Sequence, residues 1–342
     1  MTEIKIEKTK EASGQSELRQ DIVTGDWVLI ATGRAKRPDA VVQTDRIASR
    51  DEFDPFENPE ESGQEKDVLI YRRDDGDWSV RVIPNKYPAF SRGRSVKELS
   101  EGPYFSMNGV GYHEIVITRD ARRSLPLLET WQVAEVIDAY RERYLALMNR
   151  KSVNYIQVIH NHGKEAGASL SHPHSQLMAI PVISPYIKLE LDGAENYYRS
   201  NKEKVYSVIA EYEEKQGKRV VYENEHFIAF CPFASRGAFE IMILGKRPNP
   251  YFERITDEEQ FACAEVLQKA LQAIYAGLND PAYNFYIHSA PCDGQEYPHY
   301  QWHIEILPHT ATWGGFELST GIEISTIEPE VAAEYLRSKL TS

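Results

Sequence analysis

The chain has 342 residues, of which 42% are hydrophobic and 27% are charged, with a formal net charge of -13 at pH 7. Its length suits two domains of ordinary size or one large domain. The excess of acidic residues argues against nucleic acid as a partner, and no apolar run approaches the length of a membrane span, so no membrane partner is expected. Three scattered cysteines, an odd number, favour a reduced, cytoplasmic chain over a disulfide scaffold.

The first half of the chain is expected to consist of strands around one helix. Residues 1–20 are polar, lack the apolar core of a signal peptide and are expected to form a loosely docked arm. β-branched and aromatic residues predict strands, and helical spacing predicts a helix. The expected strands fall within residues 27–31, 78–90, 111–118, 154–163 and 171–181, and the expected helix within residues 127–150.

The second half is expected to repeat this order. Two strands are predicted within residues 226–247, a helix over 256–278, and two further strands within 283–291 and 299–309. Thr256 and Glu259 have the spacing of a capping box at the start of that helix. The repeated order predicts an internal duplication, with domains at residues 1–195 and 196–342.

One short segment, "GASLSHPHSQLMAIP" at residues 167–181, holds two histidines one residue apart. In a strand, alternate side chains share a face, so His172, His174 and Gln176 are expected to point the same way. Pro173 cannot donate a hydrogen bond to a neighbouring strand, which places this end of the strand at an edge or an opening. A ligand pocket is expected there.

Such a pair of histidines fits phosphoryl chemistry. A neutral imidazole is a nucleophile toward phosphorus when an acceptor holds the proton on its other nitrogen, and residues 161–169 are expected to supply that acceptor. Gln176 is a donor for phosphoryl oxygens, with Ser169 and the backbone of Gly167 nearby in sequence. Positive charge is available from the basic loop at residues 34–37. A hydrogen-bonded structural pair and a metal site are the open alternatives.

The motifs, taken together, carry a family resemblance. In chain order they are "TGDWVLIATGRAKRP", "VIPNKYPAF", "GYHEIVI", "NHGKEAGASLSHPHSQ" and "WHIEILP". They resemble the galactose-1-phosphate uridylyltransferase family, the transferase branch of the histidine-triad superfamily, across most of the chain. The resemblance implies an α+β fold of two tandem histidine-triad-like domains, each a mainly antiparallel sheet with packed helices.

The resemblance also implies a reaction and its residues. Members of the family transfer a uridylyl group from UDP-glucose to a histidine and then to galactose-1-phosphate, so a nucleotide sugar and a hexose-1-phosphate are the expected partners. His174 matches the nucleophile, and Gln176 matches the residue that holds the phosphoryl oxygens. The expected substrate-binding residues are Arg34, Arg37, Asn85, Asn161, Gly167, Ser169 and Glu323. Lys86, Glu317 and Ile322 depart from the family pattern near the base and the sugar.

Two metal sites are implied by the same resemblance. The first set matches a structural zinc site in which Asp54 and Glu57 replace two cysteines, beside His113 and His172. The second set, for zinc or iron, comprises Glu190, His288, His303 and Glu305, with Glu305 in place of a histidine and His299 as a substitute. Carboxylates and imidazoles can bind these ions, although thiolates hold zinc more tightly. An empty acidic loop and a plain polar cluster are the respective alternatives.

The identity of the base and of the acceptor stays open at this point. Residues 281–291, "PAYNFYIHSAP", and 314–321, "GGFELSTG", also resemble plant ADP-glucose phosphorylase, a family member with adenine and phosphate in these roles. A dinucleotide hydrolase is a more distant alternative, disfavoured by Gln176 where that branch has a third histidine. A non-enzymatic nucleotide or metal sensor is disfavoured by the presence of His174. A homodimer, in which a C-terminal segment completes the neighbour's site, is expected from the resemblance.

Overall fold

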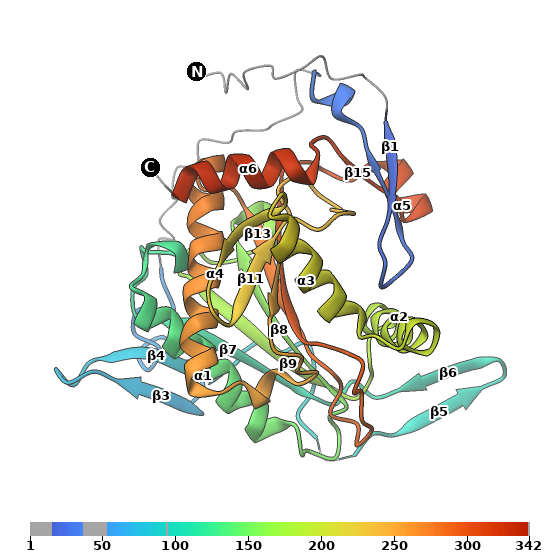
Figure 1. Ribbon diagram of the computed structural model, residues 1–342. Helices are drawn as coiled ribbons and strands as arrows, with labels where there is room; N and C mark the ends of the chain where they lie inside the picture. The colour runs from blue at the N-terminus through green and yellow to red at the C-terminus, as the bar shows by residue number, and fades with distance from the viewer. Residues whose placement is uncertain (1–15, 37–52, 94, 341–342) are drawn as a thin grey trace.

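A computed structural model describes residues 16–36, 53–93 and 95–340, and a ten-stranded sheet forms its centre (Figure 1). The strand order is β10-β11-β12-β14-β13-β8-β9-β7-β4-β3, and every neighbouring pair is antiparallel. The first half supplies β3 (Leu69–Arg72), β4 (Trp78–Pro84), β7 (Tyr112–Thr118), β8 (Tyr155–His162) and β9 (His174–Ile180). The second half supplies β10 (Val220–Glu223), β11 (Phe227–Phe230), β12 (Ile241–Gly245), β13 (Tyr283–His288) and β14 (His303–Pro308). The α+β prediction is confirmed.

The sheet repeats the same arrangement in its two halves. Each half runs three strands, a long helix and two more strands, and the halves meet where β8 pairs with β13. The predicted repeat in the order of elements is therefore present. Because the halves share one sheet and one core, their division into two domains at residues 195 and 196, which falls within α2 (Pro185–Asn201), stays a prediction.

Three helices cover one face of the sheet. They are α1 (Thr130–Leu147), α4 (Asp257–Leu278) and α6 (Pro329–Leu340), and their apolar side chains join those of the strands in the largest core cluster (Figure 1). The start of α4 follows from its sequence. The hydroxyl of Thr256 accepts from the backbone N–H of Glu259 at 3.2 Å, and the Glu259 carboxylate accepts from the N–H of Thr256 at 2.9 Å. The predicted capping box is confirmed.

The opposite face is covered only in part. Helix α3 (Val205–Gln216) packs over β11 and β12, and α2 packs beside α3 in the same cluster. Toward the other end of the sheet, Phe56 packs with apolar side chains of β4 and β7 in a smaller cluster. The same face carries the histidines of β9 and β14: His174 lies against Phe56, and His303 lies beneath α3 against Tyr206.

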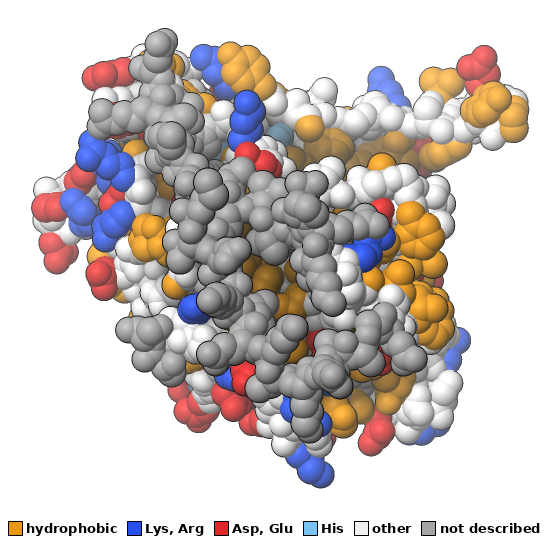
Figure 2. Space-filling model, turned by 90° about the horizontal axis from the view of Figure 1, so that it is seen from above, with side chains coloured by type: hydrophobic (Ala, Val, Ile, Leu, Met, Phe, Trp, Pro, Cys, Tyr) orange, Lys and Arg blue, Asp and Glu red, His pale blue; other side chains and the backbone are white. Residues whose placement is uncertain are grey.

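Smaller elements project from this body. Strands β1 (Glu17–Gln20), β2 (Trp27–Ile30) and β15 (Glu323–Ser325) form a separate sheet. The 3₁₀ turn η1 (Thr32–Lys36) follows β2 in the chain, and the short helix α5 (Gly315–Thr320) precedes β15. The hairpin of β5 (Glu98–Glu101) and β6 (Tyr104–Met107) extends as an arm with hydrophobic side chains at its end (Figure 2). Among the described residues, no helix has the length and apolar character needed to cross a bilayer.

Candidate active site and metal cluster

His174 begins β9 on the sheet face that the three core helices leave uncovered. Ser175, the next residue, points the other way and bonds with Tyr140 of α1, which confirms the expected alternation along this strand. The ring of His174 is 6% exposed, and Phe56 contacts it edge-on with centroids 5.3 Å apart. His174 therefore lies buried at the end of a central strand, with an aromatic ring against it.

The backbone decides which nitrogen of His174 carries the proton. Nδ1 lies 2.8 Å from the carbonyl oxygen of His172, and because a carbonyl only accepts, Nδ1 must donate. Burial lowers the pKa of His174, against the opposing effect of this hydrogen bond, and favours the neutral ring. Nε2 then carries a free lone pair. The acceptor expected within residues 161–169 is instead the His172 carbonyl.

His172 offers no such lone pair. Its Nε2 lies 2.7 Å from the carbonyl oxygen of Thr118, and its Nδ1 lies 2.8 Å from a carboxylate oxygen of Asp54. The side chain is 1% exposed. With an acceptor against each nitrogen, the ring serves as an anchor between β7, β9 and the loop of Asp54. Of the two histidines, His174 is the one whose contacts leave a nitrogen lone pair available.

His113 orients Gln176. The backbone N–H of Ala89 donates to Nδ1 of His113 at 3.2 Å, so in the neutral ring Nε2 carries the proton. Nε2 lies 2.8 Å from Oε1 of Gln176 and donates to it. Burial lowers the pKa of His113 and supports the neutral form. The amide nitrogen of Gln176 is left to donate elsewhere, as a phosphoryl oxygen requires, and the side chain of Asn85 lies against the same histidine ring.

The end of β8, which carries Asn161, and the loop before β9 bring three more predicted residues to this end of the sheet. Gly167 has φ +84°, a left-handed conformation suited to glycine, and a Cβ built there would lie 3.8 Å from Nδ2 of Asn161. Ser169 is exposed on the same loop. Asn161 also receives a 2.7 Å hydrogen bond from Asn284, a residue that the sequence reading missed. The sequence did contain a signal for Asn284, because it lies on the same face of its strand as His288, four positions away.

The remaining predicted substrate residues lie on another element or outside the described residues. Arg34 is exposed on η1 and Glu323 begins β15, so both belong to the small sheet and not to the sheet of His174. Burial raises the pKa of Glu323. Arg37 lies outside the described residues.

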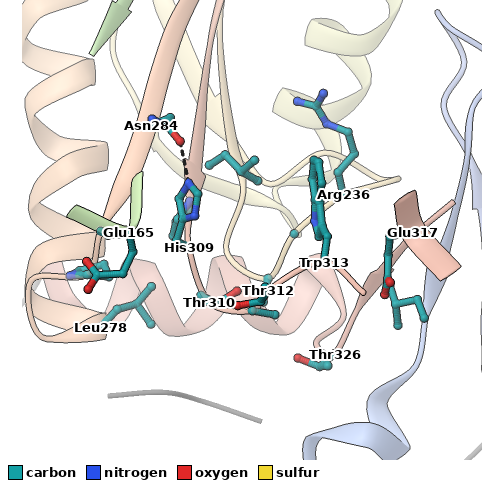
Figure 3. A pocket seen from close by; sticks show the side chains of 18 residues that line it. Glu165, Arg236, Leu278, Asn284, His309, Thr310, Thr312, Trp313, Glu317 and Thr326 are labelled. Atoms are coloured by element: carbon teal, nitrogen blue, oxygen red, sulfur yellow. Dashed lines mark hydrogen bonds between the residues drawn. The ribbon is translucent and has the colours of Figure 1, made fainter. Parts of the chain in front are cut away.

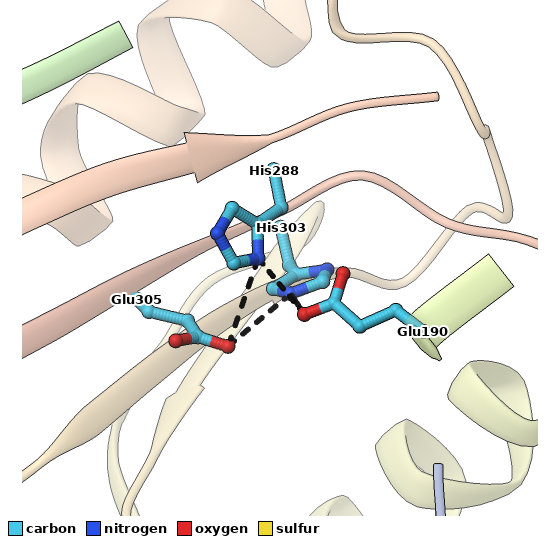
Figure 4. A group of neighbouring side chains, drawn as sticks. All are labelled: Glu190, His288, His303 and Glu305. Carbon is cyan, nitrogen blue, oxygen red and sulfur yellow. Dashed lines mark hydrogen bonds and ion pairs between the residues drawn. The ribbon is translucent and has the colours of Figure 1, made fainter. Parts of the chain in front are cut away.

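The second predicted metal set comes together as a buried cluster (Figure 4). One possible ligand atom from each of Glu190, His288, His303 and Glu305 lies within 4.8 Å of all the others, and these residues are 1–5% exposed. Nδ1 of His288 is 2.9 Å from Oε1 of Glu190, and Nε2 of His303 is 3.5 Å from Oε1 of Glu305. His299 instead stacks on Tyr198, so it is not in this cluster.

The donor set of this cluster suits a divalent cation. Nδ1 of His303 donates to the Gln301 carbonyl at 3.0 Å, and its buried Nε2 has no hydrogen-bond partner, which leaves a lone pair aimed at the cluster. Without a metal, burial raises the pKa of Glu190 but the two imidazoles lower it to about 2, while the carboxylates raise the pKa of His303 to about 10 despite burial. The orphaned nitrogen and the two carboxylates fit zinc or iron.

Three residues missed by the sequence reading support these ligands. The guanidinium of Arg236 donates to Oε2 of Glu305, so Oε1 is the oxygen that faces the histidines. Arg236 also donates to the hydroxyl of Tyr286 at 2.8 Å, and Tyr300 donates to Oε2 of Glu190. These contacts fix which carboxylate oxygen points inward, a role that outer residues commonly play around metals. Arg236 lies in the connection between β11 and β12, and no local sequence pattern indicated its role.

The first predicted metal set does not form a comparable group among the described residues. Asp54 and His172 are in direct contact, whereas His113 faces Gln176 and Glu57 is exposed. Both nitrogens of His172 already have hydrogen-bond partners. A zinc ion on these four residues therefore stays a prediction.

A cavity of about 630 Å³ opens beside Glu165, in the loop between β8 and β9, and Asn284 of β13 (Figure 3). Asn284 and His309 lie on one side of it, with Glu165 near them, and Trp313 and Glu317 lie toward β15. Asn284, which lines the cavity, also donates a hydrogen bond to Asn161 of β8. Its walls combine an aromatic ring, carboxylates and hydroxyls.

The sequence is similar to known nucleotide-sugar enzymes. The family model described as galactose-1-phosphate uridyl transferase, N-terminal domain, matches residues 5–183, and a domain of unknown function, DUF4921, matches residues 130–342. ADP-glucose phosphorylase of Arabidopsis thaliana is 34% identical over 334 residues, which are 94% of this chain and 92% of that protein. Galactose-1-phosphate uridylyltransferase of Thermotoga maritima is 29% identical over 333 residues, 94% of this chain and 98% of that protein.

Solved structures show the same relationship. The crystal structure of the Arabidopsis thaliana ADP-glucose phosphorylase with bound ADP-glucose superposes with a TM-score of 0.80 at 32% identity, over 94% of this chain and 99% of that one. A uridylyltransferase structure superposes with a TM-score of 0.74 at 24% identity, over 96% and 99% of the two chains, and shows a common fold.

Proposed function

Since the chain belongs to the galactose-1-phosphate uridylyltransferase family and is an enzyme of the nucleotidyltransferase type, we propose that it transfers a nucleotidyl group through His174. The donor is a nucleotide sugar and the acceptor carries a phosphate. The observation that carries this proposal is the hydrogen bond from Nδ1 of His174 to the His172 carbonyl. It keeps the proton on Nδ1 and leaves Nε2 free to attack.

The first half of the proposed reaction forms a nucleotidyl-histidine. Nε2 of His174 attacks the phosphorus next to the nucleoside, a P–N bond forms, and the bond to the bridging oxygen breaks. The electron pair of that bond leaves with the sugar phosphate. The amide of Gln176, oriented by His113, donates to the non-bridging oxygens as charge develops on them. Asn161, on the neighbouring strand β8, and Ser169, on the loop that follows it, are proposed to assist.

The second half returns His174 to its starting state. An oxygen of the acceptor phosphate attacks the same phosphorus, the P–N bond breaks, and the electron pair returns to Nε2. With a hexose-1-phosphate as acceptor the product is a new nucleotide sugar. With inorganic phosphate as acceptor the product is a nucleoside diphosphate.

Two substrate pairs are therefore candidates. Uridylyl transfer from UDP-glucose to galactose-1-phosphate is supported by the family and by the similarity to the Thermotoga maritima enzyme. Phosphorolysis of ADP-glucose is supported by the similarity to the Arabidopsis thaliana enzyme, at 34% identity and a TM-score of 0.80. Both use the same histidine, so the proposed chemistry is independent of this choice.

One experiment tests the chemistry and separates the substrates. The protein is mixed with UDP-glucose or ADP-glucose without acceptor, and glucose-1-phosphate release and intact mass are measured. We expect one nucleoside monophosphate on the protein, labile in acid, with one donor preferred. Adding galactose-1-phosphate or phosphate to the isolated adduct then identifies the acceptor. A wild-type protein that carries no adduct with either donor would contradict the proposal.

We also propose that Glu190, His288, His303 and Glu305 hold a zinc or iron ion. The orphaned Nε2 of His303 and the inward oxygens of the two carboxylates support this. Four protein ligands fill a tetrahedral set, so the ion would be structural, tying α2 to β13 and β14.

A homodimer remains part of the proposal. Arg34 and Glu323 lie on a sheet separate from that of His174, which is compatible with a site shared between two copies. The β5–β6 arm exposes Leu99, Tyr104 and Phe105 far beyond the body, and an isolated hairpin of this size gains stability from a partner surface. Sedimentation equilibrium of the wild type and of a Tyr104→Ser, Phe105→Ser variant tests it, since a monomeric wild type would exclude the shared site.

A further inference from the structure

We propose that Asn284 and His309, two residues of the second half, form a relay that positions the amide of Asn161 for nucleotidyl transfer. This inference rests on the proposed function of His174. It assigns Asn284 and His309 as positioning residues, which act through Asn161.

The sheet register places these groups in one row. His160 pairs with Ser175, so the same antiparallel register sets Asn161 opposite His174, on the face away from α1. Asn161 in turn pairs with Asn284 of β13. Directly paired residues point to the same face, and their Cβ atoms lie about 5 Å apart. Asn161 is therefore flanked by the nucleophile on one side and by Asn284 on the other.

A backbone carbonyl fixes the direction of every hydrogen bond in the relay. The side-chain nitrogen of Asn284 lies 2.9 Å from the carbonyl oxygen of Ala166, and since a carbonyl only accepts, this atom is the Nδ2 donor. The same Nδ2 lies 2.7 Å from the side chain of Asn161, whose facing atom must then be Oδ1. Oδ1 of Asn284 is left to accept from Nε2 of His309 at 2.6 Å (Figure 3).

This direction has a consequence for catalysis. With Oδ1 of Asn161 occupied by Asn284, its Nδ2 is turned toward Gly167, where a Cβ would lie 3.8 Å from it. The amide thus presents a donor, and no acceptor, on the side of the glycine loop that precedes His174. A reversed amide would present a lone pair to the phosphoryl oxygens and repel them. The Ala166 carbonyl prevents this reversal, because it holds Nδ2 of Asn284 toward Asn161, and His309 supports that orientation by donating from Nε2 to Oδ1 of Asn284.

The relay also anchors the loop itself. Asn284 uses both protons of its Nδ2, one on Asn161 and one on Ala166, and Ala166 ends the 3₁₀ turn η3 (Lys164–Ala166) directly before Gly167. A single side chain from β13 therefore fixes both a side chain and a stretch of backbone beside His174. A purely structural role for Asn284 would affect folding alone, whereas the relay predicts a loss that depends on Asn161.

A double-mutant cycle separates these roles. The variants are Asn284→Leu, which is neutral and similar in size, Asn161→Ala and the pair. Asn201→Leu, on the exposed end of α2, is the control for a general effect of replacing an amide. The readout is the rate of adduct formation on His174 with the preferred donor alone, at saturating donor, with melting temperature and circular dichroism for folding.

We expect Asn284→Leu to slow adduct formation by about tenfold to a hundredfold, the value of a hydrogen bond to a charged group, with donor affinity changed much less. In the Asn161→Ala background the same change should cost less than about twofold, because the group it orients is gone. Equal losses in the two backgrounds would overturn the relay, as would an unchanged rate in the single variant. A wild type without any adduct would instead refute the proposed function itself.

His309 provides an independent variant should Asn284→Leu fail to fold. His309→Gln keeps a donor near the position of Nε2, and His309→Leu removes it. The relay predicts that His309→Leu slows adduct formation and that His309→Gln restores most of the rate. Equal rates for these two variants would contradict a role for the donor.

Discussion

The carbonyl oxygen of His172 lies 2.8 Å from Nδ1 of His174, so the main chain of one histidine fixes the tautomer of the other. The side chain of His172 is not needed for this contact. It is engaged by Asp54 and by the Thr118 carbonyl, which distinguishes His172, in the bend before β9, from His174, the first residue of that strand. The free lone pair and the anchoring contacts are thus divided between residues two positions apart.

Replacing His174 by Gly is expected to abolish the nucleotidyl adduct. The change removes Nε2 and leaves a space of about the size of imidazole, so added imidazole is expected to restore part of the transfer. Intact-mass spectrometry after mixing with each donor provides the measurement. A labelled His174→Gly protein would rule out this residue as the nucleophile.

Replacing His172 by Asn is expected to preserve the adduct, because the backbone carbonyl that orients His174 remains. The buried hydrogen bonds to Asp54 and Thr118 are disrupted, so a loss of about 1–3 kcal/mol of folding stability is expected. Urea denaturation measures the stability, and mass spectrometry measures the adduct. Complete loss of the adduct in a folded His172→Asn protein would contradict the assignment.

Replacing His113 by Leu is expected to slow adduct formation by about tenfold to a hundredfold, since Gln176 loses the donor that orients its amide. His113→Gln retains a donor near the position of Nε2 and should lose less. Rapid-quench kinetics with saturating donor compares the two. If His113→Leu and His113→Gln react equally fast, Gln176 is not oriented through this contact.

The burial of His174 determines how the rate of adduct formation is expected to depend on pH. The pKa of His174 lies below its ordinary value of 6.5 because burial disfavours the charged ring, so the neutral nucleophile persists as the pH falls below 6.5. Adduct formation should therefore lose rate only at a pH below 6.5. Single-turnover rates between about pH 4.5 and 8 test this against the unperturbed histidine value. An acidic limb above pH 6.5 would contradict the buried, neutral nucleophile.

Folding stability should likewise decrease as the pH falls. His160, like His174, is buried and has a lowered pKa, so the unfolded chain binds protons more readily than the folded one. Their contribution is complete above about pH 6.5, the unfolded value, and is lost as the pH falls toward the folded values. The urea concentration at the unfolding midpoint should decrease as the pH is lowered across this range. A folded His160→Gln protein should show a weaker dependence of this midpoint on pH.

Metal content provides a further test. Protein purified without added metal is expected to carry about one divalent ion per chain, bound by the buried glutamate–histidine cluster. His303→Ala removes the orphaned Nε2 and should abolish binding, whereas Asp54→Asn should leave the ion in place. Elemental analysis and melting temperature with and without chelator are the readouts. An ion lost from Asp54→Asn but retained in His303→Ala would place it at the other predicted set.

Local regularities made several features predictable from sequence. The two-residue period of a strand places His174 and Gln176 on one face of β9, and it does the same for His303 and Glu305 on β14, whereas His172 lies before the strand. The capping box at Thr256 is a contact within one turn. These features depend on residues a few positions apart, so spacing and residue type are sufficient.

The tertiary structure decided which atoms are left free to react. His113 faces Gln176 across 63 positions, Asn284 faces Asn161 across 123, and Arg236 reaches Glu305 across 69, and none of these pairings has a local signature. It also decided that both halves share one sheet through β8 and β13. A strand period fixes the face on which a side chain lies, but a tautomer or an amide orientation depends on the partner opposite, which only the packing of distant segments supplies.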